Sequence, residues 1–479
     1  MEHKTSKESE MNNSHVLLFP NPQPGHISPF LDLAELLCLS GLPHVTFLTT
    51  LQMQHRLLNH SNTVSRFAPY PGFQLEGISD GLSPSDSVRT VKEVIDSYRS
   101  LYTTTKDLLK AMLASGALGG GDNHRPQVTC FIADGSLEFL MDVAEQFNIP
   151  VISFHTYSAA TTWLTFCVPE IIQEGKLPFA GDDDGKIRTI KGLEGLLRAK
   201  DMGTSPKELG QFILSSAARH QQTKATIFNT FEELEGSILT YIRTRCPSTY
   251  AIGPLHTHLA HRSSQSLSSS SILQEDKSCM KWLDSQPMKT VVYVSFGSQA
   301  VLKKEEFLEL WHGLISSGKK FLWVMRERLA EEELSRDQME KESDGRGYVV
   351  SWAPQRDVLA HPAIGCFLTH CGWNSVLEGL VAGVPMICWP HYGDQQLNGR
   401  CVSEVYKIGV YLKDYPCERD AIARVVNQVM GQKKKELGIS SESLAASSKK
   451  AVSEGGSSFN IFHQLVDFIG SVVHEKSGI

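Results

Sequence analysis

The chain has 479 residues, more than one hydrophobic core usually organises, so two domains of ordinary size are expected. Hydrophobic residues make up 41% of the chain and charged residues 21%, which is typical of a globular protein that buries a core. A formal net charge of -7 argues against a nucleic-acid partner, because such partners need a clustered positive surface. We therefore expect no nucleic-acid binding.

Residues 1–14 form a polar tail without the apolar stretch of a secretory signal, and we expect a cytoplasmic protein. No window holds about 20 consecutive apolar residues, so no membrane span is expected. The ten cysteines show no regular pairing pattern, and several lie in short apolar runs, which favours reduced thiols. We also expect a monomer.

Short apolar runs alternate with helical patterns along the chain, as in parallel sheets covered by helices. In the first half, strands are predicted at residues 15–20, 45–49, 128–133, 151–154 and 226–229. Apolar positions between residues 30 and 37 indicate an amphipathic helix between the first two strands. This part of the chain therefore begins with a βαβ unit.

A second series of strands is predicted at residues 291–296, 321–325, 348–350, 366–369 and 386–388. Together the two series predict an α/β protein with two doubly wound, Rossmann-like domains. A Ser- and His-rich stretch between them is typical of a linker. The domains are therefore predicted at residues 15–255 and 281–456, with a linker at 256–280 and a C-terminal helix at 457–479 that can return to the first domain.

The strongest local signal runs from Trp352 to Gln395. Its polar and indole groups follow the carboxyl ends of predicted parallel strands, where open α/β sheets bind ligands. Trp352 offers a flat face for a base, Glu378 can accept from ribose hydroxyls, and Asp394 with Gln395 can hold several hydroxyls of a sugar. Gly372, at a strand-to-helix turn, lets backbone donors and the helix dipole face a diphosphate.

The run WAPQRDVLAHPAIGCFLTHCGWNSVLEGLVAGVPMICWPHYGDQ resembles the signature box of plant secondary-product UDP-glycosyltransferases, which are family 1 enzymes of the GT-B fold. The resemblance extends over nearly the whole chain from about His15. It implies two Rossmann-like domains that face each other across a cleft. The first would bind a small-molecule acceptor and the second a UDP-sugar.

The resemblance also assigns donor-binding roles. The uracil would contact Trp352, Ala353 and Gln355, and the ribose would contact Glu378. The diphosphate would be held by Ser298, His370, Asn374 and Ser375. The sugar would contact Trp373, Asp394 and Gln395, and Gln395 fits a glucose donor. Taken singly, Trp352, Trp373 and His370 are better explained as core residues, and their joint occurrence reverses that preference.

The acid–base candidates lie in the first half. His26 stands at the start of the first helix, whose dipole disfavours the imidazolium and keeps a neutral ring available as a base. Asp134 ends a strand at the same edge of the sheet and can fix the tautomer of His26 and stabilise its protonated form. By the resemblance these two are the catalytic pair. Without the signature box, a capping or surface His26 and a turn Asp134 would be the better interpretation.

The acceptor pocket is assigned by family position alone. The residues expected to line it are His155, Tyr157, Trp163, Met202 and Tyr392, and Thr156 is expected to reach the sugar. Trp163 can equally be part of the core, as aromatic residues usually are. The sequence as a whole resembles the branch acting on small terpenoids, such as iridoid glucosyltransferases. A hydroxyl and a carboxyl acceptor stay open alternatives.

These parts imply an inverting transfer that needs no metal. His26 would take the acceptor proton while the nucleophile attacks the anomeric carbon opposite UDP, so that an α-linked donor gives a β-glycoside. Turn amides, Ser298, His370 and the helix end would stabilise the departing UDP. No cofactor is expected beyond UDP-glucose as the donor co-substrate.

Two groups of residues match the spacing of known metal sites. Residues 182–184 match an Asp-x-Asp pattern, but their glycine-flanked loop favours a solvated charge run. His256, His258 and His261 lie in the predicted linker without a nearby cysteine, which favours a solvent-exposed cluster. No metal site is therefore expected.

Two other functions stay open. A dinucleotide-dependent oxidoreductase also uses doubly wound halves, but it needs a Gly-x-Gly-x-x-Gly turn where residues 21–25 read NPQPG. A catalytically silent UDP-sugar-binding protein would share the signature box. His26 and Asp134 argue against the silent protein, and only turnover separates it from an enzyme.

Overall fold

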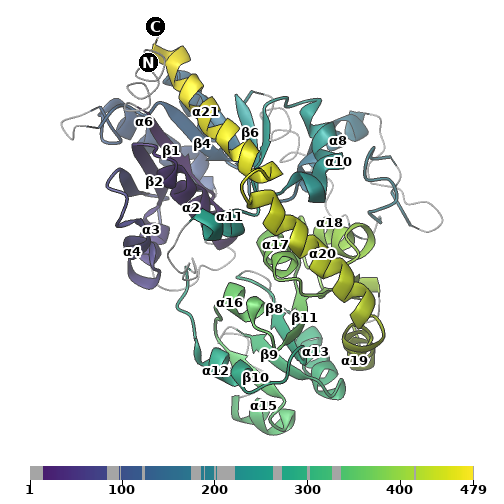
Figure 1. Cartoon of the computed structure of the whole chain (residues 1–479). Helices are drawn as coiled ribbons and strands as arrows, with labels where there is room; N and C mark the ends of the chain where they lie inside the picture. Colours follow the sequence, from purple (N-terminus) through teal and green to yellow (C-terminus); the bar gives the residue numbers. More distant parts are fainter. Residues whose placement is uncertain are drawn as a thin grey trace. The chain divides into compact units, whose positions relative to one another are not determined.

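A computed structural model describes residues 14–82, 96–97, 99–120, 125–173, 185–187, 189–198, 201, 222–262, 272–298, 302–325, 336–414 and 417–477. The chain divides into two compact units. The first unit comprises Met1–Pro169, Lys207–Ile272 and Ala451–Ile479, and the second comprises Glu170–Pro206 and Leu273–Lys450. Figure 1 shows the elements of both units, which are described separately below.

The first unit contains a seven-stranded sheet in which every neighbouring pair is parallel. Its strands, in spatial order, are β3 (Phe73–Ile78), β2 (His44–Thr50), β1 (His15–Phe19), β4 (Cys130–Asp134), β5 (Val151–His155), β6 (Ala225–Phe228) and β7 (Thr249–Ala251). The order reverses direction at β1, so the loops after β1 and β4 leave the same edge of the sheet side by side. This is where ligands bind in doubly wound sheets.

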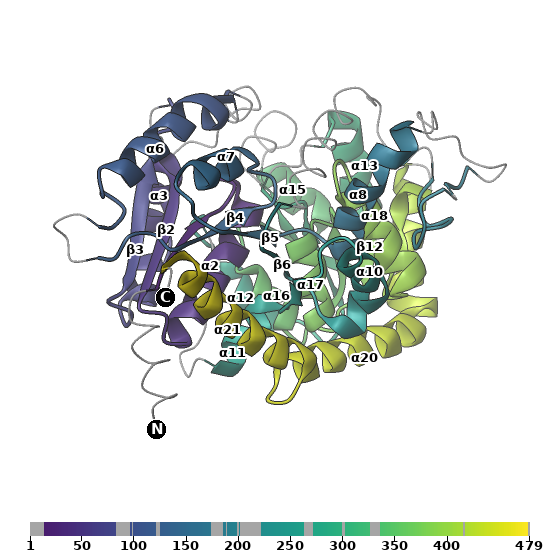
Figure 2. The ribbon, with the colours of Figure 1, turned by 90° about the horizontal axis from the view of Figure 1, so that it is seen from above.

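Alternating side chains of β1, which lies between β2 and β4, belong to two hydrophobic cores on opposite faces of the sheet. Val16 and Leu18 belong to one buried cluster, whereas Leu17 and Phe19 belong to the cluster on the opposite face. Helices α2 (Pro24–Leu39), α11 (Leu255–Arg262) and α21 (Ser457–Ser477) contribute to the first cluster, and α6 (Lys106–Ala114) and α7 (Phe139–Gln146) to the second. Figure 2 shows these two helical layers on opposite sides of the sheet.

The C-terminal helix α21 packs on the first unit. Phe462, Leu465 and Ile469 are fully buried in the cluster that contains Val16 and Leu18. Their spacing of three and four residues places them on one face of a helix. Burying each such side chain stabilises the fold by about 1.5–3 kcal/mol, which is why this segment returns to the N-terminal sheet.

Among its described residues, the first unit contains four further helices, of which the first two also contribute to the first cluster through Met53, Leu57 and Phe67. They are α3 (Leu51–His60), α4 (Thr63–Phe67), α8 (Ala159–Gln173) and α10 (Glu232–Arg243). The sequence of α8 crosses the division between the units, because its last residues, from Glu170 onward, are grouped with the second unit.

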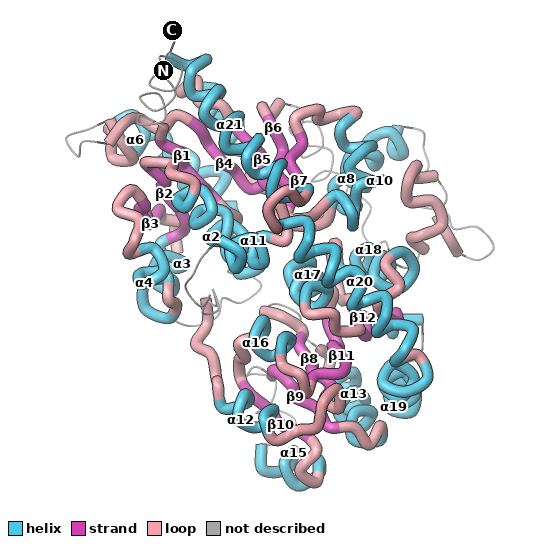
Figure 3. The backbone as a smooth tube through the Cα atoms, in the orientation of Figure 1, coloured by secondary structure: helices cyan, strands magenta, loops and turns pink. Residues whose placement is uncertain are grey.

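The second unit contains a six-stranded parallel sheet, drawn in magenta in Figure 3. In spatial order its strands are β10 (Gly347–Val350), β9 (Lys320–Val324), β8 (Val291–Ser295), β11 (Ile364–Thr369), β12 (Met386–Cys388) and β13 (Gly409–Tyr411). Its helices are α12 (Ser278–Asp284), α13 (Lys304–Ser316), α15 (Arg336–Ser343), α16 (Gln355–Ala360), α17 (Trp373–Val381), α18 (Gln395–Arg400), α19 (Arg419–Asn427) and α20 (Lys434–Val452). Within the described residues, no helix of either unit has the length and apolar character needed to cross a bilayer.

The ten predicted strands are confirmed within two residues at each end. Three strands were not predicted: β3, β7 and β13. β7 and β13 have three residues each, and β3 has no fully apolar run, so their hydrophobic pattern is too short or too mixed to stand out. The predicted α/β class with two doubly wound sheets is confirmed.

The predicted boundary between the halves differs from the structure at two places. Residues from His256 were expected to begin a linker, but Leu255–Arg262 form helix α11, and Leu259 is fully buried in the first core. Residues Glu170–Pro206 were assigned to the first domain, but they group with the second unit. The reason is long-range packing, since Asp201 pairs with the buried Arg400.

Candidate active site

His26 and Asp134 meet at the edge of the first sheet. Helix α2 begins at Pro24, whose fixed φ suits the first helical turn, and this places His26 just after β1. Asp134 is the last residue of β4, the neighbour of β1. The Nδ1 atom of His26 lies 2.7 Å from Oδ2 of Asp134. The predicted pair is therefore in direct contact.

The carboxylate of Asp134 is fully buried, whereas the imidazole of His26 is 22% exposed. Oδ1 of Asp134 accepts hydrogen bonds from the backbone N–H of Ser136 (3.0 Å) and from its hydroxyl (2.7 Å). Burial alone would raise the pKa of Asp134, but His26 and the two donors of Ser136 outweigh it and lower the pKa below its ordinary value. Asp134 is thus an ionised acceptor, which assigns the proton to Nδ1 of His26 and the lone pair to Nε2.

Thr156 contacts the same ring nitrogen. It follows directly after β5, the other neighbour of β4, and its Oγ1 lies 2.9 Å from Nδ1 of His26. The family resemblance assigned Thr156 to the sugar, and the structure places its hydroxyl on the histidine. The Nδ1–H group therefore has two acceptors, which restrict the rotation of the ring.

A buried polar cluster adjoins this pair. Nδ1 of His155 lies 3.0 Å from Oγ1 of Thr162, and the His155 ring contacts the ring of Tyr157 with centroids 5.0 Å apart. Gly135 allows this packing, because a Cβ there would lie 3.0 Å from the Tyr157 hydroxyl and 3.1 Å from Nε2 of His155. His155 and Tyr157 thus lie beside the strand end that carries Asp134.

The other residues predicted for the acceptor pocket are placed differently. The ring of Trp163 stacks on Tyr241 of α10 with centroids 5.3 Å apart, and the Arg245 guanidinium lies over it. These contacts make Trp163 a packing residue between α8 and α10. Tyr392 belongs to the second unit and is 47% exposed. Met202 lies outside the described residues.

In the second unit, the predicted donor-binding residues follow the carboxyl ends of neighbouring strands. Ser298 follows β8, Trp352 follows β10, and His370 follows β11, which pairs with β8. Asp394 follows β12 and precedes helix α18. The strand order brings these loops to one edge of the sheet, as parallel pairing requires.

Gln355, Ser375 and Glu378 form one hydrogen-bonded group. The side-chain amide of Gln355 donates to Oγ of Ser375 (3.0 Å) and to Oε2 of Glu378 (2.8 Å). Arg356 donates to the other carboxylate oxygen of Glu378 at 3.0 Å. Ala353, two residues before Gln355, is 4% exposed. The structure therefore brings together Gln355, predicted for the base, Glu378, predicted for the ribose, and Ser375, predicted for the diphosphate.

His370 is held between two glycines. A Cβ at Gly297 would lie 2.7 Å from the His370 ring, and a Cβ at Gly372 would lie 2.5 Å from its Nε2 atom. Burial, reinforced by His391 and opposed by the carbonyl of Ser295, lowers the pKa of His370 to about 4. At neutral pH this imidazole is uncharged, so it can act toward a diphosphate only as a hydrogen-bond donor.

The turn after His370 starts helix α17. Trp373, its first residue, is 3% exposed, and Asn374 is half-buried. Gln395 is 4% exposed, and its Oε1 accepts from the backbone N–H groups of His391 (2.9 Å) and Tyr392 (3.3 Å). Gln395 thus orders the loop that precedes it.

Sequence reasoning missed two residues of this region. Cys371 has a φ of 67°, which is unusual for a residue with a side chain. Asn398, in α18, is fully buried and donates to both the Cys371 carbonyl and the Asp394 carboxylate. The position of Asn398 after the signature box carried no signal, because its partners are defined only by the fold.

Among the described residues, no group of three His, Cys, Asp or Glu side chains could hold a metal ion. Residues 182–184 lie outside the described residues. The expectation of an exposed histidine cluster is wrong for His258, which is fully buried against the rings of Phe459 and Phe462 in α21.

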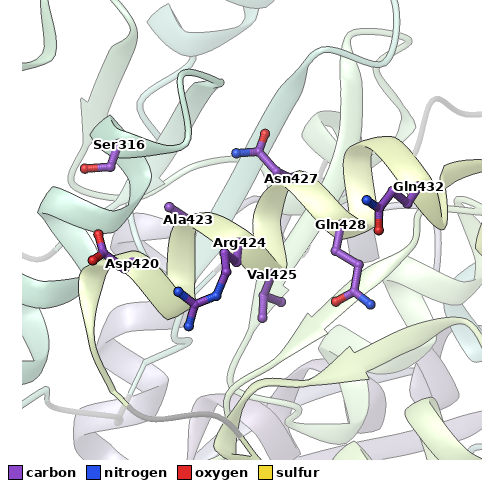
Figure 4. A pocket seen from close by; sticks show the side chains of 8 residues that line it. All are labelled: Ser316, Asp420, Ala423, Arg424, Val425, Asn427, Gln428 and Gln432. Carbon is purple, nitrogen blue, oxygen red and sulfur yellow. The ribbon is translucent and has the colours of Figure 1, made fainter.

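An open hollow of about 720 Å³ is lined by α19, by residues that follow it and by Ser316 of α13. Figure 4 shows that its lining side chains are mainly polar and charged. They include Ser316, Asp420, Arg424, Asn427, Gln428 and Gln432. No residue predicted for the donor or acceptor lines this hollow.

The sequence profile described as UDP-glucoronosyl and UDP-glucosyl transferase matches residues 256–438. A 7-deoxyloganetic acid glucosyltransferase from Catharanthus roseus is 44% identical, over 96% of this chain and 98% of its own. The myricetin 3-O-rhamnoside 1,2-glucosyltransferase UGT709G2 from Crocosmia x crocosmiiflora is 41% identical, over 96% of each chain.

Solved structures agree with the two-sheet fold. The crystal structure of Os79 from O. sativa in complex with UDP superposes with a TM-score of 0.77 at 27% identity. It covers 96% of this chain and 100% of the other. The likeness extends over both units and confirms the fold that the signature box implied.

Proposed function

The chain belongs to the family of UDP-glucoronosyl and UDP-glucosyl transferases, and we propose that it transfers glucose from UDP-glucose to a hydroxyl or carboxyl group of a small lipophilic terpenoid or iridoid. The observation that carries this proposal is the contact of 2.7 Å between His26 and the buried, ionised Asp134. Such a pair supplies a base at neutral pH. A silent binding protein would not need it, and the chain lacks the Gly-x-Gly-x-x-Gly turn that a dinucleotide-dependent oxidoreductase needs.

In the proposed reaction with a hydroxyl acceptor, Nε2 of His26 takes the proton of the acceptor oxygen as that oxygen attacks the anomeric carbon. A carboxyl acceptor is already ionised at neutral pH, so its oxygen attacks without transferring a proton. The new bond joins the acceptor oxygen to this carbon, and the bond to the diphosphate oxygen breaks on the opposite face, so that UDP leaves with the electron pair. Asp134 stabilises the imidazolium that forms. Inversion converts the α-linked donor into a β-glucoside or a β-glucose ester.

The donor would bind along the loops of the second unit. The Trp352 ring would stack on uracil beside Ala353 and Gln355, and Glu378 would accept from the ribose hydroxyls. Ser298, His370, Asn374 and Ser375 would donate to the diphosphate. Trp373, Asp394 and Gln395 would contact the sugar. The proposal is supported by the common sheet edge from which the loops of the second unit leave and by the hydrogen bonds that join Gln355, Ser375 and Glu378.

We propose that the departing UDP is stabilised without a metal ion. The neutral His370 and the first backbone N–H groups of α17 are preorganised donors, which act without reorganisation as charge develops. This part of the proposal predicts turnover in the presence of a chelator.

The acceptor class is inferred from the relatives. One is named for 7-deoxyloganetic acid and another, a mogroside I-A1 synthase from Siraitia grosvenorii, is 40% identical. We place the acceptor beside His26, with His155 and Tyr157 as its neighbours in the first unit. We also propose a cytoplasmic monomer, which light scattering and cell fractionation would test.

The first experiment measures UDP release from UDP-glucose in EDTA with a panel of terpenoid, phenolic and carboxylic acceptors. The wild type is run beside His26→Ala and beside His261→Ala, which changes an exposed histidine of the same unit. Acceptor-dependent release that survives EDTA and is lost only in His26→Ala supports the proposal. Binding of UDP-glucose without release for any acceptor would favour the silent protein, and full activity of His26→Ala would remove His26 as the base.

A further inference from the structure

Asn398 joins two parts of the proposed donor site. It lies in α18 and is fully buried. Its side-chain amide donates to the carbonyl oxygen of Cys371 at 3.1 Å and to Oδ2 of Asp394 at 2.8 Å. Its backbone N–H also donates to the carbonyl of Asp394 at 2.9 Å. One amide group therefore links the turn after β11 to the turn after β12.

The hydrogen bond from Asn398 to Cys371 stabilises an unfavourable backbone conformation. Cys371 adopts a φ of 67°, a conformation that costs a residue with a side chain about 1–2 kcal/mol. Its N–H donates to Oγ1 of Thr369 at 3.2 Å, and its carbonyl accepts from Asn398. The peptide groups on both sides of Cys371 are thus fixed, and these peptides set the positions of His370 and Gly372.

The second link orients a carboxylate. Asp394 precedes α18 by one residue, and the amide of Asn398, one helical turn later, holds its Oδ2 atom. A buried amide with two acceptors of this kind restricts both, because a buried N–H group that loses its acceptor pays its full desolvation cost. The Asp394 carboxylate and the Cys371 turn therefore keep a constant separation.

We propose that Asn398 is a positioning residue for the sugar nucleotide. Its side chain fixes the position of the turn at Cys371, which would bind the diphosphate, relative to the carboxylate of Asp394, which would bind the sugar. This inference rests on the proposed function, which assigns those two roles. Asn398 does not need to touch the donor. Its effect is to make recognition of the diphosphate and recognition of the sugar depend on each other.

The test replaces the amide by a carboxylate of the same shape. In Asn398→Asp both donors are lost, and the new carboxylate faces the oxygens of Asp394 and Cys371. The matched control is Asn427→Asp, the same chemical change at an exposed position that lines the hollow of Figure 4. Calorimetry gives the Kd for UDP, and steady-state kinetics give kcat/KM for UDP-glucose and UDP-galactose.

Asn398→Asp is expected to weaken UDP binding about tenfold and to reduce the preference for UDP-glucose over UDP-galactose about tenfold, the effect of one lost hydrogen bond on each partner. Asn427→Asp is expected to match the wild type.

A lower Tm for Asn398→Asp with unchanged UDP affinity and unchanged sugar preference would overturn the inference, because Asn398 would then be only structural. If this variant does not fold, Asn398→Ala removes the donors without adding charge and carries the same expectations. UDP binding is measured without turnover. If the wild type binds UDP but transfers no sugar, the proposed function is wrong. The UDP affinities of the variants would still show whether Asn398 positions the diphosphate turn.

Discussion

The hydroxyl oxygen of Thr156 lies 2.9 Å from Nδ1 of His26, the same nitrogen that contacts Asp134. A single N–H group cannot make two full hydrogen bonds, so the threonine and the aspartate share it. The sharing holds the ring with Nε2 directed away from both acceptors. The contact makes Thr156 part of the histidine's surroundings and gives the residue a role that its sequence position alone did not suggest.

Thr156→Val is expected to lower kcat about fivefold to tenfold, since it removes a net contribution of about 1 kcal/mol from one hydrogen bond. The KM for UDP-glucose is expected to stay near the wild-type value. Thr156→Ser, which keeps the hydroxyl, serves as the control and should retain activity. A rise in the KM for UDP-glucose with unchanged kcat would show instead that Thr156 acts on the sugar.

Asp134→Asn is expected to reduce kcat by about 10³-fold to 10⁴-fold, the loss seen when a carboxylate that fixes a histidine tautomer becomes an amide. The amide can donate to Nδ1 of His26 and move the ring proton to Nε2, which then has no lone pair for the acceptor. Steady-state kinetics at saturating UDP-glucose measure the effect. Asp107→Asn, an exposed change in α6, is the control. Equal activity of the two variants would contradict the assignment of Asp134.

Gly372→Ala is expected to weaken UDP binding by at least about tenfold, the cost of one lost hydrogen bond to a charged group. The backbone at residue 372 suits alanine, but its Cβ would lie 2.5 Å from Nε2 of His370 and must displace the ring. Gly438→Ala, in α20, meets no atom within 4 Å and should bind UDP like the wild type. Calorimetry compares the two. Equal affinities would show that His370 does not contact the nucleotide.

Acid pH is expected to destabilise the fold through buried histidines. Burial, the largest effect at each site, lowers the pKa of His15, His258, His370 and His391 to about 4. Above pH 6.5 these rings are neutral in both states, so they do not affect the free energy of unfolding. Between pH 6.5 and 4 the unfolded chain binds more protons, and stability falls as the pH is lowered.

His258→Asn isolates one of these groups. The amide can replace Nδ1 of His258, which lies 3.2 Å from the carbonyl oxygen of Ile252. Between pH 6 and 5, the slope of the unfolding free energy with pH should become smaller by up to about 1.4 kcal/mol per pH unit. Urea unfolding at several pH values measures this slope. His261→Asn changes an exposed ring and should not alter the slope. If the slope is unchanged in both variants, His258 is not neutral in the folded protein.

Arg400→Met is expected to destabilise the second unit by about 3–5 kcal/mol, because it leaves the buried Asp201 without its cation. The side chain of Arg400 is fully buried, donates to Asp201 and Asp414, and lies over the ring of Tyr411. Arg419→Met breaks an exposed pair with Glu309 and should have a smaller effect. Thermal unfolding compares them, and equal losses would show that the buried pair is not a principal anchor of residue 201.

Local patterns in the sequence were sufficient to predict most strands and the candidate site residues. The ten strands that were predicted are short, strongly apolar runs that sheets bury on both faces, so their pattern survives any tertiary context. The signature box predicted the donor residues. The resemblance that it carries also predicted His26 and Asp134 as the catalytic pair, which lone His and Asp residues would not have done.

Contacts between distant residues were decided only by the tertiary structure. Helix α11 is too polar to stand out, and it is buried because α21, some 200 positions later, brings Phe459 and Phe462 against His258. Residue 201 joins the second unit through Arg400, and Asn398 acquires its two acceptors from separate turns. Local patterns report burial and helix or strand period, whereas a hydrogen bond between remote side chains depends on how the chain folds back on itself.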